Sequence, residues 1–470
     1  MRLYNSLTRQ VEEFIPLKDK KVRFYSCGQT VYLDAHIGNA RTYSFWDVLV
    51  RYLRYRGYDV FWVQNFTDVG HLTDDADAGE DKIIRTAKDK KIEPMVLVES
   101  NIKRFFEDMD PLNIQRADIY PRATGHILEM IDFLQDLFDK GFAYEVNGSL
   151  YFDTTKFPTY GQLSPTKYDD DSVGARIAVN PDKRNPRDFA LWIRAPPEHL
   201  MKWNSPWGLG YPGWHLECSV MSQKYLGETL DIHAGGIDHL NLHHDNEIAQ
   251  SEARTGKKFC NHWLHAAFLT VNGERMGKSK GNYILVRDLL KETDPMLVRL
   301  FLINGHYRKS VDFNKEVLQQ TQVLLDRIKT SIASLKQAPG GKKSDLNSAI
   351  SEVKEEFNKA MDDDLNTVNA IHAVMQFIRI VNSSLDNQKN TLNKAYETII
   401  TLMGVLGIRL DTTVSTSGAS ISDLVELLIQ LRADLRKAKQ YELGDKIRAS
   451  LLELNIQLED KPDGTIWKMK

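Results

Sequence analysis

Two potential metal ligands stand four residues apart in the segment LHHDNEIAQSEARTG at 242–256. In a helix, residues four apart project from the same face, so His243 and Glu247 point at one place. An imidazole and a carboxylate at this spacing are typical of a metal site. The segment also fits a polar helix start, because acids near a helix N-terminus complement its dipole and Gly256 can end the helix. The segment alone leaves both interpretations open.

The chain has three cysteines, Cys27, Cys218 and Cys260. They are too few and too scattered for a disulfide framework, so we expect free thiols in a reducing compartment. Each thiol could bind zinc, or could be a small buried side chain, which is the default for a lone cysteine.

Another group of residues suits phosphate. In CGQTVYLDAHIGNART, residues His36, Gly38 and Asn39 stand where a strand passes into a helix. Unpaired N–H groups and the dipole at a helix N-terminus favour an anion. Gly38 would let a phosphate or a flat ring approach the backbone, and His36 and Asn39 can donate hydrogen bonds to phosphoryl oxygens. A plain strand-to-helix turn is the alternative.

The segment NGERMGKSKGN at 272–282 places Arg275, Lys278 and Lys280 among three glycines. A glycine-rich loop that carries cations suits a triphosphate, because negative charge develops on pyrophosphate as it leaves the α-phosphorus. A solvated basic loop would have the same composition. The combination of this loop with the His36 segment is what favours nucleotide chemistry.

A parallel sheet is needed to bring these segments together. Apolar and β-branched runs at 22–28 and 59–68 predict strands, and the helical periodicity between them, closed by Gly57, predicts a helix. Such a β-α-β unit implies a parallel sheet with ligands at the carboxyl ends of its strands. Strand-like runs within 229–273 resume the sheet.

The expected fold class is α/β: a Rossmann-like catalytic domain with an inserted connective module, then an α-helical bundle and a small C-terminal module. A helix at about 124–140 and a hairpin on Asn147-Gly148 lead into an antiparallel insertion, and the Ser/Thr/Gly-rich stretch 411–423 has linker composition. The expected parts are 1–140 and 226–305 for the two halves of the catalytic domain, 141–225 for the insertion, 306–410 for the bundle and 424–470 for the C-terminal module.

Composition sets wide limits. A chain of 470 residues with a net charge of −3 is large enough for several domains, and its charge argues against a protein that coats nucleic acid over its whole surface. The N-terminus has no secretory apolar region, and no run of about 18 apolar residues occurs. We therefore expect a cytoplasmic protein without a membrane span.

The two phosphate segments together resemble the two signatures of class I aminoacyl-tRNA synthetases. The segments FYSCGQTVY, HIGNAR, NFTD, GWHLECS, DIHAGGIDH, HHDNEIAQSE and MGKSKGN follow the order seen in cysteinyl-tRNA synthetases, and the resemblance extends to LNIQLEDKPDGTIWK at the C-terminus. This resemblance implies that L-cysteine, ATP with Mg²⁺ and cysteine tRNA are the substrates, and that the reaction passes through a cysteinyl-adenylate.

The resemblance also implies a role for individual residues. One zinc ion per chain would be bound by Cys27, Cys218, His243 and Glu247 and would recognise the substrate thiol. Thr67, Trp214, His233 and Asp238 would surround the amino acid. His36, Asn39, Arg275 and Lys278 would act in catalysis, with His36, Gly38 and Lys278 on ATP, and Asp445, Asp460 and Trp467 would contact the tRNA anticodon. Zinc would distinguish cysteine from serine because it binds thiolate in preference to a neutral hydroxyl.

The chain departs from the family pattern at three places. Asn39 replaces the last histidine of the first signature, and Arg275 replaces the first lysine of the second signature, followed by Gly277 rather than serine. Because Asn39 can donate a hydrogen bond and Arg275 keeps the charge, we expect activity to survive. The acidic stretch 70–81 is longer than usual, and we interpret it as a surface insertion near the rim of the active site.

Two other functions remain open. A ligase that joins cysteine to an amino sugar in mycothiol synthesis would share the catalytic core, but would lack a full anticodon-binding tail such as 306–470 resembles. A catalytically inactive paralogue that binds RNA or zinc would not need both signatures together with all four ligand types. We expect the protein to be a monomer.

Overall fold

The computed structural model describes residues 1–70, 72, 79–164, 180–277, 280–343, 346–410, 421–454, 456–461 and 464–469. The chain divides into two compact units, Met1–Leu410 and the tail Asp411–Lys470. None of the helices in the described part of the chain combines the length and the apolar character that a membrane span needs.

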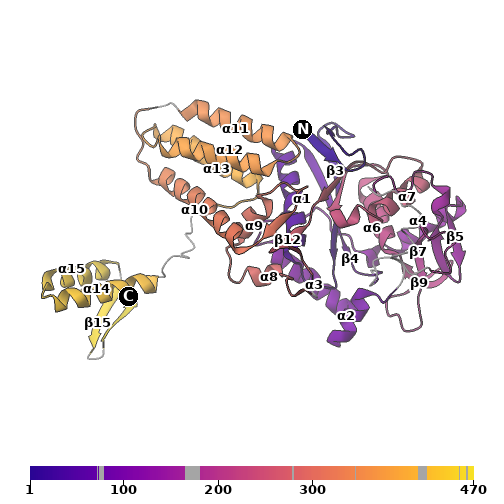
Figure 1. Cartoon of the computed structure of the whole chain (residues 1–470), viewed down its shortest axis with the longest axis horizontal. Helices are drawn as coiled ribbons and strands as arrows, with labels where there is room; N and C mark the ends of the chain where they lie inside the picture. Colours follow the sequence, from indigo (N-terminus) through magenta and orange to yellow (C-terminus); the bar gives the residue numbers. More distant parts are fainter. Residues whose placement is uncertain are drawn as a thin grey trace. The chain divides into compact units, whose positions relative to one another are not determined.

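A four-stranded parallel sheet forms the centre of the first unit (Figure 1). Its strands, in spatial order, are β11 (Cys260–Ala266), β10 (Leu230–Gly236), β3 (Lys21–Thr30) and β4 (Asp59–Thr67). Helix α1 (Ile37–Tyr55) crosses from β3 to β4 and buries an apolar face that includes Phe45, Trp46 and Leu49. The predicted β-α-β unit and parallel sheet are therefore confirmed.

Strand β3 contains an irregularity that bears on the site. Its register with β4 shifts between Ser26 and Gln29. A Cβ added at Gly28 would lie 1.6 Å from the backbone oxygen of Asn65, and the Gly28 N–H donates to the Asn65 side chain at 2.9 Å. Only glycine fits this close approach, and such a bulge changes the direction of its neighbours' side chains. Cys27 lies within it.

Helices and a second sheet follow β4. Helices α2 (Lys82–Lys90) and α3 (Pro94–Met109) come first, and α4 (Ile127–Asp139) is preceded by a 3-10 turn. The helix predicted at 124–140 is thus confirmed, with a tighter first turn. Asn147 and Gly148 both have positive φ and join β5 (Ala143–Val146) to β6 (Ser149–Phe152), as the hairpin prediction required.

The inserted sheet is antiparallel throughout. It has the order β5-β6-β7-β9-β8, with β7 at Phe189–Arg194, β8 at Trp203–Ser205 and β9 at Gly208–Pro212. Helix α6 (Trp214–Leu226) follows and packs against β3, β4 and α7 (His243–Thr255). Because α6 packs on the parallel sheet, we propose that the insertion ends at 213 rather than 225.

The acidic stretch 70–81 is only partly described. Leu72 and Asp81 are buried, and the Asp81 carboxylate accepts hydrogen bonds from the N–H groups of Gly70, Ile83 and Ile84. The ends of this stretch therefore belong to the folded core, which corrects the interpretation of the whole stretch as a surface insertion. Residues 71 and 73–78 lie outside the described part.

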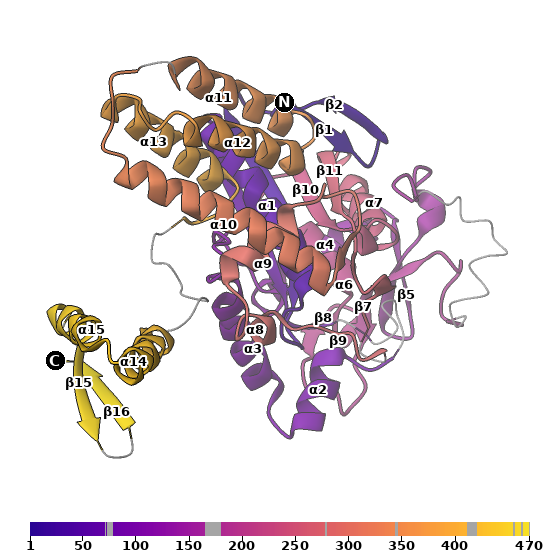
Figure 2. The same ribbon diagram turned by 60° about the vertical axis from the view of Figure 1, so that its left-hand side comes forward.

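Smaller elements complete the first unit. An N-terminal hairpin pairs β1 (Arg2–Asn5) with β2 (Gln10–Glu13), and a small sheet joins β12 (Leu269–Val271), β13 (Glu274–Arg275) and β14 (Val311–Phe313). Short α8 (Val286–Leu289) and buried α9 (Pro295–Ile303) lead to a helical bundle made of α10 (Lys315–Gln337), α11 (Leu346–Asp362), α12 (Thr367–Asn382) and α13 (Lys389–Val405) (Figure 2).

The tail has its own small core. Helices α14 (Ile421–Lys437) and α15 (Tyr441–Glu453) pack on a hairpin of β15 (Ile456–Lys461) and β16 (Gly464–Met469). Among the described residues of the tail, the buried apolar core consists of Val425, Leu451, Ile456 and Leu458.

Candidate active site

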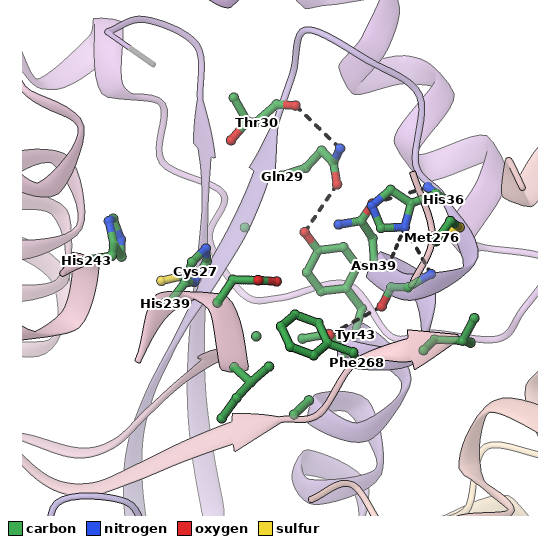
Figure 3. Close-up of a pocket in the computed structure, with 18 of the residues that line it drawn as sticks. Cys27, Gln29, Thr30, His36, Asn39, Tyr43, His239, His243, Phe268 and Met276 are labelled. Carbon is green, nitrogen blue, oxygen red and sulfur yellow. Dashed lines mark hydrogen bonds between the residues drawn. The ribbon is translucent and has the colours of Figure 1, made fainter. Parts of the chain in front are cut away.

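A cavity of about 540 Å³ lies at the carboxyl ends of β3 and β10. The start of α1, the first residue of α6, the segment 236–243 and the loop after β12 also line it. Figure 3 shows Cys27 and His243 toward one end of the cavity and His36, Asn39 and Met276 toward the other. Members of the two groups that the sequence singled out, Cys27 and His243 in one and His36 and Asn39 in the other, therefore lie at opposite ends of one cavity.

Four potential metal ligands meet at the first end. Cys27 comes from β3, Cys218 from α6, and His243 and Glu247 from α7, and their ligand atoms all lie within 4.8 Å of one another. All four side chains are buried. The atoms that bind one tetrahedral zinc ion lie about 3–4 Å apart, given zinc–ligand distances of roughly 2.0–2.3 Å. This group thus has the composition that one ion requires, and a spacing close to the one it requires.

Neighbouring side chains hold these ligands in place. The His243 Nε2 is 3.0 Å from the Glu247 Oε1, and its other ring nitrogen is 2.9 Å from the His215 Nδ1. The second Glu247 oxygen is 2.8 Å from the His233 Nε2. The Glu247 Oε1 is buried, and its contact with the His243 Nε2 does not have the geometry of a hydrogen bond. Outer contacts of this kind orient metal ligands, and a buried oxygen without a hydrogen bond suits coordination of a cation.

Burial favours the uncharged form of each member of this group. It raises the pKa of the Cys27 and Cys218 thiols and of the Glu247 carboxyl, and lowers the pKa of His243 to about 3. Desolvation penalises the ionised carboxyl and thiols and the protonated imidazole alike. A dication reverses this effect for the acids, because a coordinated thiol gives up its proton. The donor set therefore fits a bound dication.

A second group of potential ligands shares two of these residues. Cys27 and Glu247 also lie within 4.8 Å of nitrogens of His233 and His244. The His244 Nε2 is 3.3 Å from the Cys27 Sγ, and its Nδ1 is 2.7 Å from the His265 Nε2. Sequence reasoning missed His244 and His265. Seven of the 13 histidines lie between 215 and 265, and this density is the signal that could have found them.

At the other end, His36 corrects one expectation. Its Nδ1 accepts hydrogen bonds from the N–H groups of Gly38 and Asn39, at 3.0 and 3.3 Å, and the Ile37 N–H donates to the Ile284 carbonyl. The N-terminus of α1 is therefore capped by the protein itself rather than left with unpaired N–H groups. Because Nδ1 accepts, the proton of the neutral ring is on Nε2, and that nitrogen is the one able to donate.

Gly38 and Asn39 take part in the same cap. A Cβ at Gly38 would lie 2.8 Å from the His36 Cε1, so glycine leaves room for the imidazole of this chain. The Asn39 Oδ1 accepts from the His36 N–H at 3.2 Å, which completes a capping box. The His36 imidazole therefore occupies the space over Gly38.

Two residues assigned to different substrates contact each other. The Arg275 Nη2 is 2.7 Å from the Asp238 Oδ1, both side chains are largely exposed, and both line the cavity. Asp238 thus has a cationic partner at the entrance to the site. Lys278 lies outside the described residues.

Of the other residues predicted to contact the substrate amino acid, one lines the cavity and two do not. Trp214 lines the cavity, and its ring centroid is 4.3 Å from that of His243. Thr67 and His233 are buried and are not among the described residues that line the cavity. Thr67 instead accepts a hydrogen bond from Asn65, at 3.2 Å. The sequence did not indicate Asn65, which also binds the Gly28 N–H and lies 3.8 Å from the Cys218 Sγ.

In the tail, the three predicted anticodon contacts have different surroundings. Asp445 is exposed on α15. The Asp460 carboxylate binds the Arg432 guanidinium through two hydrogen bonds, at 2.7 and 2.8 Å, and this contact lowers the pKa of Asp460. Trp467 is half-buried against the tail's apolar core. Asp460 and Trp467 thus both make contacts within the tail itself, whereas Asp445 is exposed.

Solved structures share this architecture. Methionyl-tRNA synthetase of Mycobacterium tuberculosis, in complex with methionyl-adenylate, aligns with a TM-score of 0.59 at 14% identity over 87% of this chain and 94% of that one. LeuRS of Agrobacterium radiobacter K84, in a ternary complex, aligns with a TM-score of 0.59 at 12% identity over 85% of this chain and 86% of that one. At such identities the likeness shows the fold alone.

Sequence comparison is more specific. The family described as the tRNA synthetases class I (C) catalytic domain matches residues 13–323, and the DALR domain matches 356–411. The fold is that of a class I aminoacyl-tRNA synthetase. Cysteine--tRNA ligase of Clostridioides difficile is 44% identical over the whole of both chains, and that of Thermococcus gammatolerans is 43% identical over 100% of this chain and 99% of its own. The chain belongs to the cysteine–tRNA ligase family.

Proposed function

We propose that this ligase activates L-cysteine with ATP to give cysteinyl-adenylate and then transfers the cysteinyl group to cysteine tRNA. One observation supports this most directly: a group of buried thiol, imidazole and carboxylate donors lies at one end of the same cavity that has His36, Gly38 and Asn39 at the other end. An enzyme that joins cysteine to adenylate needs both a thiol-recognising end and a phosphate end.

The metal in this proposal is zinc, bound by Cys27, Cys218, His243 and Glu247. Zinc favours nitrogen and sulfur ligands, and the donor set contains two sulfurs and a nitrogen. When bound, zinc would supply preference for a thiolate over the hydroxyl of serine, a distinction that pocket shape alone makes only about a hundredfold for such similar molecules. We prefer this set to the alternative with His233 and His244, because His243 lines the cavity that the substrate must enter.

The residues of the chain position the substrate for the first step. The substrate carboxylate attacks the α-phosphorus, a phosphorus–oxygen bond forms, and the bond to pyrophosphate breaks with its electrons on the leaving group. Asp238 would bind the substrate ammonium and Trp214 would form a wall beside it. His36 would donate from Nε2 to phosphoryl oxygens, while Arg275 and Lys278 would stabilise the charge on pyrophosphate, with Mg²⁺ bound to ATP.

This step requires contacts to be exchanged. Arg275 binds Asp238 in this structure, whereas catalysis assigns one to phosphate and the other to ammonium. Substrates of opposite charge could separate such an exposed pair at low cost, because exposed ion pairs contribute only about 0–1 kcal/mol.

The tail would read the anticodon through Asp445, Asp460 and Trp467. Carboxylates accept hydrogen bonds from base amino groups, and an indole can stack on a base. Asp460 would then have to share its oxygens between a base and Arg432. Deleting 411–470 should lower tRNA charging much more than cysteine-dependent exchange of pyrophosphate into ATP. Equal losses in both assays would contradict an anticodon role, and circular dichroism of the truncated chain controls for misfolding.

Cysteine-dependent pyrophosphate exchange, followed by charging of cysteine tRNA, tests the proposal as a whole. Exchange with cysteine but not with serine, together with charging, is the expected result. Exchange without charging, in the presence of an amino sugar acceptor that is consumed, would instead support the mycothiol-type ligase. Absence of exchange in folded, metal-loaded protein would indicate the inactive paralogue.

A further inference from the structure

Helix α2 contributes a cation to the edge of the active-site cavity. Among the described residues between β4 and α6, which include three helices and the whole antiparallel sheet, Lys82 is the one that lines the cavity. Neither signature segment contains it. Lys82 is the first residue of α2, and the other residues of that helix do not line the cavity.

The start of α2 is firmly anchored. The Asp81 carboxylate, 1% exposed, accepts hydrogen bonds from the N–H groups of Ile83 and Ile84 at 2.8 and 3.2 Å, and from Gly70 at 2.9 Å. Because Gly70 closely follows β4, this contact ties the beginning of α2 to the end of the catalytic sheet. The position of Lys82 is therefore set by the same strand that borders the site.

The outer face of α2 carries a second cation. Ile83, Ile84 and Ala87 are buried on the inner face. Arg85 stands three residues after Lys82, on the same side of the helix, and is exposed. Residues at this spacing have Cβ atoms about 5–6 Å apart. Lys82 and Arg85 thus form a short row of positive charge from the cavity edge outward.

An aromatic ring adjoins this row. The Lys82 Nζ is 5.8 Å from the centroid of the Tyr32 ring, and Tyr32 also lines the cavity. Cations beside an aromatic face are the combination by which proteins bind single-stranded nucleic acid, with phosphates on the cations and a base on the ring. A nucleoside triphosphate inside the cavity would contact Arg275, which lines it, whereas Arg85 does not line the cavity and would not contact that nucleotide.

We propose that Lys82 and Arg85 bind backbone phosphates of the tRNA 3′ strand where it enters the cavity, with Tyr32 offering a stacking surface to a base. The inference rests on the proposed charging of tRNA, which requires the terminal ribose to reach the activated carboxyl. Lys82 is the one described residue of the 68–213 stretch that lines the cavity, and Tyr32, from the segment after β3, lines it as well.

The test compares Lys82→Met and Arg85→Met with Lys88→Met in the full-length enzyme. Lys88 lies on the same helix, is exposed, pairs with Glu80 at 2.8 Å, and does not line the cavity. The two row variants should raise the KM for tRNA several-fold, and each should reduce the dependence of log affinity on log salt concentration by about 0.7–0.9. Lys88→Met should match the wild type, and Lys82→Arg should restore most of the affinity.

Pyrophosphate exchange separates this inference from the proposed function. Arg85→Met should exchange at the wild-type rate, because Arg85 lies outside the cavity. If Lys82→Met lowers exchange as much as charging, the residue binds the triphosphate and the RNA assignment is wrong. If both row variants charge tRNA like the wild type with an unchanged salt dependence, the inference fails while the proposed function stands. A wild-type enzyme that neither exchanges nor charges would overturn the proposed function itself.

Discussion

The two ends of the active-site cavity are built in different ways. At the metal end, Cys27, Cys218, His243 and Glu247 are buried, come from three elements and are held by further histidines. At the phosphate end, His36 caps its own helix and Arg275 pairs with an exposed acid. In the proposed mechanism the metal end is thus preorganised, whereas the phosphate end would exchange internal contacts for contacts to substrate.

This difference matches what each end has to distinguish. Telling sulfur from oxygen requires ligands fixed in place before the substrate arrives, because a loosely held site would adapt to either atom. Stabilising a departing pyrophosphate requires interactions that are stronger in the transition state than in the ground state. The helix cap of His36 and the ion pair of Arg275 are both weak, so both side chains can be released to contact the phosphates in the transition state.

The largest effect is expected from a substitution that disrupts the metal end alone. Cys218→Ser should lower zinc content from about one per chain, as expected for a four-ligand site, to a small fraction, because a neutral hydroxyl is a poor substitute for thiolate. Cys260→Ser is the matched control, since Cys260 is equally buried but belongs to neither donor group. Zinc content is measured by atomic emission after gel filtration. Equal metal content in the two variants would remove Cys218 from the site.

Gly38→Ala should break the phosphate end alone. Its new Cβ would lie 2.8–2.9 Å from the His36 imidazole, which must then move from its place on the helix cap. Overpacking of this kind costs about 1–3 kcal/mol, or roughly a tenfold to hundredfold loss of exchange rate if the cost falls on the transition state. Zinc content should not change. A variant that loses zinc along with exchange would show that the two ends are not independent.

Much of this architecture can be read from the sequence, because amphipathic and continuous apolar patterns report directly on α1, β3 and β4. His243 and Glu247 could be paired from helical spacing alone. Helix α6 could not be recognised, since almost every residue in it is buried and no polar stripe marks it as a helix. The hydrogen bonds from the Gly38 and Asn39 N–H groups to the His36 ring were also not predicted. A side chain that caps a helix and one that binds phosphate use the same donors and acceptors, so the sequence does not distinguish them.

Asp238→Asn tests whether Asp238 contacts the substrate or only holds Arg275. If Asp238 binds the substrate ammonium, the KM for cysteine should rise about tenfold, the loss expected for a hydrogen bond between charged groups, while the KM for ATP stays nearly constant. Thermal stability should be nearly unchanged, because the Arg275–Asp238 pair is exposed. A rise confined to the KM for ATP would mean that Asp238 acts only by holding Arg275.

Arg275→Lys should have the smallest effect. Lysine restores the residue usual in the second signature and keeps the positive charge, although it loses the planar guanidinium. We expect an exchange rate within about threefold of the wild type, and a larger loss for Arg275→Met, which removes the charge. Equal rates for the lysine and methionine variants would exclude a role for this charge in catalysis.

The central claim is that the metal end recognises the sulfur of the substrate, and cobalt-substituted protein tests it most directly. Cobalt in a site with two cysteine ligands gives a thiolate charge-transfer band that changes when a further sulfur binds. Addition of L-cysteine should alter this band, and L-serine at the same concentration should leave it unchanged. If neither amino acid changes the spectrum of protein that still exchanges pyrophosphate with cysteine, the metal is structural and thiol recognition resides elsewhere in the cavity.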